Sequence, residues 1–190
     1  MSDTALRGVR NNAIFASAFG VAMLLLVFVA LVVPQDVVTR NRFLHDYVAL
    51  SSTVIPGIQR LAAVSSFPEV TRLVFSLMWT LVPVFTAAYF FKVQVPEIFF
   101  TRYREKPFFL TFATVVMAIS IVLLAVLFEI TPEDLKGGLI NESVLRAVST
   151  SRMGLGLIAG FFSAGIAMMV FVVLAWFFNL PRIYLWKTGR

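Results

Sequence analysis

Four long stretches of this chain contain neither a charged residue nor a histidine: 13–33, 73–91, 108–128 and 153–178. They are 21, 19, 21 and 26 residues long, and a helix needs ~20 apolar residues to cross a hydrocarbon core. Lipid offers no partner to free backbone groups, and the stretches lack the alternation of barrel strands. The sequence therefore predicts an all-α integral membrane protein with four transmembrane helices, in which residues 1–190 form a single polytopic domain.

The composition agrees with this prediction. Hydrophobic residues make up 59% of the 190 residues and charged residues only 14%, whereas an ordinary soluble domain carries ~25% charged residues. A core of this size cannot hide so much apolar surface, which argues against a soluble enzyme and against a disordered chain. The first stretch is longer than the core of a signal peptide and no Ala-x-Ala site follows it, so we expect a retained anchor.

The distribution of charge predicts how the chain is oriented. Four spans put both termini and the loop 92–107 on one side, which holds nine Lys and Arg residues but three acids. The other side, with the loops 34–72 and 129–152, holds seven of each. Basic residues concentrate on the cytoplasmic side of membrane proteins. We therefore expect both termini and the loop 92–107 in the cytoplasm, with the chain in a bacterial inner (plasma) membrane.

The outer loop 34–72 has an amphipathic helical pattern that breaks at Pro56-Gly57. A fifth spanning helix between residues 43 and 64 is disfavoured, because Asp46 and Arg60 offset the gain from its apolar residues. The pattern favours short helices that lie on the membrane surface or re-enter it. A periplasmic lid or docking surface is the alternative. Pro68 suits the first turn of the next helix, where its missing N–H costs nothing.

Small residues recur at a spacing that allows helices to approach closely in lipid. Gly156, Gly160 and Ala164 follow one another every four residues in the fourth span, and Ala16 and Gly20 do so in the first. These residues predict a helix-packing face. The pattern leaves open whether that face joins helices of one chain or binds a second copy or another membrane protein.

Basic residues beside aromatic ones flank the cytoplasmic ends of the spans. They suit anionic lipid headgroups or, in the alternative, an acidic cytoplasmic partner. These residues are Arg102, Arg104, Lys106, Arg182 and Lys187.

Pro83 lies near the centre of the second span, where it removes a backbone donor. We expect it to kink that helix.

The sequence offers little to catalysis. It contains no cysteine and a single histidine, His45, and the spans carry no ionisable side chain for a proton relay. Phosphate-binding loops, nucleophile elbows and zinc-ligand spacings are all missing. The hydroxyl groups of the spans are expected to bond to their own backbone or to a neighbouring helix. We expect no enzyme activity, no cofactor, no metal site and no nucleic-acid partner.

These observations favour a non-enzymatic multi-pass membrane subunit. It would assemble through helix packing, with itself or with other membrane proteins, as part of a larger complex. A homo-oligomeric channel or transport component is one alternative. The other is a membrane sensor that signals to a cytoplasmic partner through the basic loop 92–107.

Overall fold

The computed structural model describes residues 3–93, 112, 115–120 and 149–184, with side chains from residue 10 and up to residue 178. Within these ranges every regular element is a helix, the helices are joined by short turns, and there is no strand. The predicted third span, 108–128, lies mostly outside the described residues. Its residues 115–120 are helical.

Among the described residues, three helices are long and apolar enough to cross a membrane: α1 (Asp3–Val32), α5 (Pro68–Lys92) and α10 (Arg152–Tyr184). Helices α5 and α10 contain the second and fourth predicted spans completely. Helix α1 contains the first predicted span except for its last residue, Val33. The expected start of α5 at Pro68 is confirmed, because this proline occupies the first turn of the helix. An all-helical chain with three candidate spans is therefore the observed architecture.

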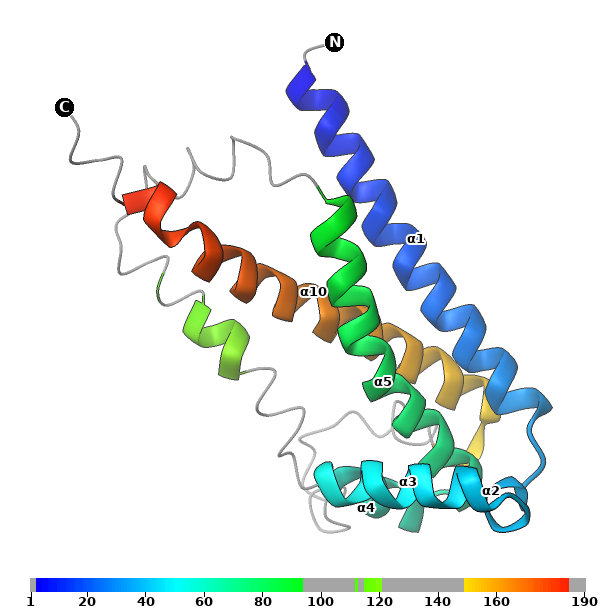
Figure 1. The fold of residues 1–190 in the computed structure, drawn as a ribbon. Coiled ribbons are helices and arrows are strands. Elements are labelled where there is room, and N and C mark those ends of the chain that lie inside the picture. Colours follow the sequence, from blue (N-terminus) through cyan, green and yellow to red (C-terminus); the bar gives the residue numbers. More distant parts are fainter. Residues whose placement is uncertain (1–2, 94–111, 113–114, 121–148, 185–190) are drawn as a thin grey trace, which may run out of the picture.

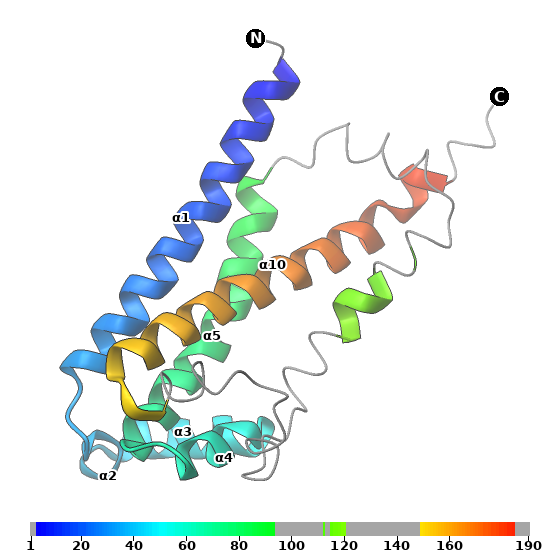
Figure 2. The same ribbon diagram turned by 180° about the vertical axis from the view of Figure 1, so that it is seen from behind.

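The long helices run in two directions (Figure 1). We call the end where α1 begins, and where α5 and α10 finish, the upper end, and the opposite end the lower end. Helix α1 descends from the upper to the lower end, whereas α5 and α10 both ascend. Helix α10 is tilted strongly against α1, so that the two helices are close near the lower end and diverge toward the upper end (Figure 2).

Three short helices gather at the lower end, between α1 and α5 in sequence. They are α2 (Val37–Arg40), α3 (Arg42–Val54) and α4 (Gly57–Ala63). Asn41 caps α3, since its side chain accepts hydrogen bonds from the backbone N–H groups of the second and third helical residues. Both views show these short helices lying across the long ones rather than along them.

The expected break at Pro56-Gly57 is confirmed, because α3 ends at Val54 and α4 begins at Gly57. The two helices have 13 and 7 residues, and each is too short to cross a bilayer that needs ~20. The segment between residues 43 and 64 is therefore not a fifth spanning helix.

Apolar side chains from the three long helices form two buried clusters. The lower cluster joins Leu26 and Ala30 of α1 to Val70 and Val74 of α5 and to Leu155 of α10. The upper cluster centres on residues of α5 and α10, with α1 side chains against it, and includes Val82, Tyr89, Ile166, Ala167 and Phe171. Helix α10 therefore takes part in both clusters.

Candidate functional site

The glycines of α10 pack directly on the backbone of α1. A Cβ atom at Gly160 would lie 2.5 Å from the Cα atom of Met23, and one at Gly156 would meet the backbone of Val27. Such distances leave no room for any side chain, so both positions require glycine. Glycines at this spacing let two helix backbones come together in lipid, where packing rather than hydrophobicity drives association. These two predicted residues therefore join helices within one chain.

Hydroxyl groups join α10 to α5. Ser163 Oγ donates a hydrogen bond to the carbonyl oxygen of Met78 at 3.2 Å. Thr86 Oγ1 lies 2.8 Å from the carbonyl oxygen of Val82 on its own helix and 3.3 Å from that of Ala167 on α10. The prediction that such hydroxyls bond to their own backbone or to a neighbouring helix is confirmed for these residues. Hydrogen bonds of this kind hold membrane helices in register.

Ala164, the third predicted small residue of α10, is fully buried. It follows Gly160 by four residues, so it lies on the same side of α10 as the two glycines. Ala159 and Ala167 are equally inaccessible. The small residues of α10 thus supply the close contacts among the three long helices.

The small residues of α1 have a different environment. Ala16 and Gly20 are exposed, and a Cβ atom at Gly20 would meet nothing within 4 Å. They share one face of α1 with Met23 and Val27, because positions 16, 20, 23 and 27 are spaced by four, three and four residues. The face that the α10 glycines cover at Met23 and Val27 is therefore uncovered at Ala16 and Gly20, nearer the upper end.

From Val21 to Val32 the outward side of α1 is apolar. Leu24 is 73% and Phe28 66% exposed, as suits contact with lipid or with another membrane protein. Exposed apolar side chains extend along α1 to its last turn and include Val21, Leu25, Leu31 and Val32. Helix α1 thus buries one side in the bundle and leaves the other free along its length.

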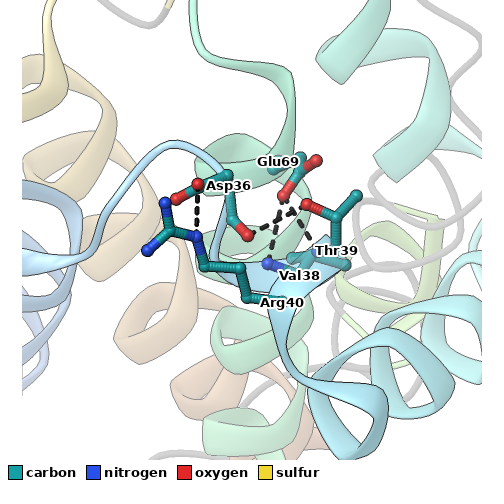
Figure 3. Close-up of polar contacts among 5 residues, drawn as sticks. All are labelled: Asp36, Val38, Thr39, Arg40 and Glu69. Atoms are coloured by element: carbon teal, nitrogen blue, oxygen red, sulfur yellow. Dashed lines mark hydrogen bonds and ion pairs between the residues drawn. The ribbon is translucent and has the colours of Figure 1, made fainter.

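A carboxylate from α5 caps α2 at the lower end (Figure 3). Glu69 Oε2 accepts hydrogen bonds from the backbone N–H groups of Val38 at 3.0 Å and Thr39 at 3.2 Å. Asp36, at the N-cap position of α2, makes no side-chain cap because its carboxylate pairs with the Arg40 guanidinium at 2.5 Å. Glu69 therefore ties α2 to α5, a contact between residues about thirty positions apart that no local pattern could have revealed.

Arg152 closes the same end of the molecule. Its guanidinium donates a hydrogen bond to the carbonyl oxygen of Val33 at 2.9 Å and lies 5.7 Å from the centre of the Phe67 ring. Val33 follows the last residue of α1, where helical carbonyl groups lack intrahelical partners. Arg152, in the first turn of α10, thus supplies a hydrogen-bond donor to the carbonyl group that follows α1. It also stacks on Phe67, the residue before α5.

Pro83 lies within α5, which remains helical on both sides of it, and its side chain is exposed. The expected kink stays a prediction.

Aromatic rings pack around the buried Tyr89, whose ring centre is 4.9 Å from that of Phe15 and 5.9 Å from that of Phe171. These rings hold the upper part of α1 to α5 and α10.

The predicted basic face falls largely beyond the described residues. Arg102, Arg104, Lys106 and Lys187 lie outside them, and Arg182 belongs to α10 but its side chain is not among those described. Their interaction with anionic lipid or an acidic partner stays a prediction.

His45 and Asp46 are neighbours on α3, with 3.4 Å between Nδ1 and Oδ1. Both side chains are largely exposed, at 62% and 68%, which is typical of a solvated polar face. Within the ranges that the structure describes, no three His, Asp or Glu side chains come together as metal ligands would.

Comparison of the chain with protein-family models, with curated proteins and with solved structures finds no match.

Proposed function

We propose that the chain is a non-enzymatic, multi-pass subunit of a larger membrane complex. It assembles with a second copy or with other membrane proteins through the outward side of α1. The observation that carries this proposal is the uncovered face at Ala16 and Gly20. The same face of α1 already accepts the backbone of α10 at Met23 and Val27, so it has the shape that a further helix needs.

The proposed topology has four spans with both termini in the cytoplasm of a bacterial cell. Helix α5 finishes at the upper end, whereas α10 begins at the lower end. In this topology the chain between them crosses the bilayer once more, and 108–128 is the one stretch of that segment with enough uncharged apolar residues. The excess of basic residues on the side of the termini supports the cytoplasmic assignment.

Gly20→Leu tests the assembly. The added side chain meets no atom of its own chain within 4 Å at the Cβ position, so the protomer folds normally while the face is blocked. We expect the wild-type protein in lipid nanodiscs or mild detergent to have a mass above that of one protomer, and Gly20→Leu to reduce it. Mass photometry or native mass spectrometry measures the difference. Val21→Leu is the matched control, because Val21 is exposed on a neighbouring face.

Gly160→Leu distinguishes assembly from folding. Its side chain would collide with the backbone of α1, so we expect it to destabilise the protomer rather than to alter the assembly selectively. A wild-type protein that is monomeric in native-like lipid and co-purifies with no other membrane protein would contradict the proposal. An unchanged assembly in Gly20→Leu would exclude this face of α1.

A further inference from the structure

One row of side chains on α3 is apolar and uncovered. Phe43 is 76%, Leu50 67% and Val54 67% exposed. With Tyr47 they follow spacings of four, three and four residues, which places all four on one face of the helix. We call these four residues the α3 row.

The other faces of α3 have evident roles. Val48, Ser52 and the capping residue Ile55 are buried against neighbouring helices. The exposed residues outside the row are Arg42, His45, Asp46, Ala49 and Thr53. Of these, His45 and Ala49 lie farthest from the row around the helix. The helix thus has a packed face, a polar face and the α3 row. Only the row has large apolar side chains that are exposed.

A hydrogen bond fixes the direction of the α3 row. The hydroxyl oxygen of Tyr47 lies 2.6 Å from Thr80 Oγ1 on α5. Thr80 Oγ1 donates to the carbonyl oxygen of Ser76 at 3.0 Å, so the Tyr47 hydroxyl is the donor to Thr80. Thr80 lies toward the upper end from α3. The α3 row therefore points toward the upper end, along α5, and into the part of the bilayer that the long helices span.

The charges at both ends of α5 give the depth of this contact. Arg72 and Lys92 are both exposed and stand twenty residues apart, or about 30 Å of helix, which is the thickness of the hydrocarbon core. Thr80 comes eight residues after Arg72, about 12 Å along the axis and so within a leaflet about 15 Å deep. The Tyr47 hydroxyl therefore reaches hydrocarbon depth, and the α3 backbone lies one side-chain length nearer the lower end.

We propose that α3 is an interfacial helix whose exposed row residues, Phe43, Leu50 and Val54, insert among the lipid acyl chains of the leaflet at the lower end. Interfacial helices bury their apolar face about 5–10 Å into the boundary between headgroups and acyl chains, and the contact of Tyr47 with Thr80 places the row on the hydrocarbon side of that boundary. His45 and Ala49, on the side away from the row, face the headgroups and water. The partner of this surface is the lipid bilayer itself.

Site-directed spin labelling tests the proposal, and the chain suits it because it contains no cysteine. Single cysteines replace Phe43, Leu50 and Val54 in the row, and His45 and Ala49 on the opposite side as matched controls. Each spin-labelled protein is placed in nanodiscs of phosphatidylcholine and phosphatidylglycerol. Collisions of the label with oxygen, which concentrates in acyl chains, are compared with collisions with a water-soluble nickel chelate. Circular dichroism confirms that each variant retains its helix content.

We expect the ratio of oxygen to nickel accessibility to be shifted upward at all three row positions relative to both controls. A ratio equal to that of the controls means that the row faces water, and it overturns the proposal. Low accessibility to both reagents, with an immobile label, means that a second copy or another protein covers the row, and it overturns the proposal as well. Nanodiscs with one protomer each separate this test from the one on assembly, because loss of assembly leaves the lipid contact of α3 in place.

Discussion

Replacing Gly160 by alanine tests how closely α1 and α10 approach. The new Cβ atom would lie 2.5 Å from Met23 Cα and 2.7 Å from Met23 N. Ordinary contacts between carbon atoms are about 3.5–4.0 Å, so the two helices have to separate by about 1 Å at this point. The obstacle is backbone, which cannot swing aside as a flexible side chain could.

The cost of that separation follows from what packed interiors tolerate. Inserting atoms into a well-packed contact costs about 1–3 kcal/mol, while exchanging glycine for alanine within a helix returns up to about 1 kcal/mol. We expect Gly160→Ala to lower the free energy of unfolding by about 0.5–2 kcal/mol, and Gly156→Ala to do the same. The double variant falls short of the sum, because one separation of the helices relieves both contacts.

The same exchange at two other glycines provides the controls. A Cβ atom at Gly20 meets nothing within 4 Å, and one at Gly165 comes 4.0 Å from the Phe19 ring, an ordinary contact. We expect Gly20→Ala and Gly165→Ala to leave stability unchanged or to raise it. Reversible unfolding in mixed detergent–SDS micelles, followed by circular dichroism, measures all four. Equal changes at the four glycines would refute the close approach of α1 to α10.

Two further predictions concern the lower end. Glu69→Ala leaves the backbone N–H groups of Val38 and Thr39 without their acceptor. We expect a loss of about 1–2 kcal/mol and faster hydrogen exchange in a peptide covering α2, with a smaller effect for Glu69→Gln, which keeps an oxygen acceptor; unchanged exchange in Glu69→Ala would contradict the remote cap. Arg152→Met removes the donor to the carbonyl oxygen of Val33, and we expect a loss of about 1–3 kcal/mol in the same unfolding assay, whereas wild-type stability would show that this contact contributes nothing.

The positions of the three long helices α1, α5 and α10 could be predicted from sequence because the determinant is local. A helix in lipid needs an uninterrupted apolar stretch of fixed length, and both the start of α5 at Pro68 and the break at Pro56-Gly57 are set by the chemistry of single residues. The contact of Glu69 with α2 could not be predicted in this way. Its carboxylate suits the start of its own helix equally well, and only the folded arrangement brings Val38 and Thr39 to it.

The small residues show where sequence reasoning stops. Gly156 with Gly160 and Ala16 with Gly20 carry the same four-residue spacing, yet the first pair packs on α1 and the second is exposed. The spacing specifies that a backbone can come close and not which backbone does so. The tilt of α10 makes the difference, and contacts between α10 and α5, such as Ser163 with Met78 and Ala167 with Thr86, hold α10 in that position.

This difference also distinguishes α1 from α10 as a surface for assembly. Where α10 is exposed it presents bulky side chains such as Phe161 and Phe162, which fill space against mobile lipid and hold another backbone at a distance. Helix α1 instead exposes Ala16 and Gly20 on the face that has already accepted one helix. Close helix contact in lipid depends on small residues, since apolar bulk gains nothing by leaving acyl chains. A further transmembrane helix therefore has a shape-based reason to pack on α1 that α10 does not offer.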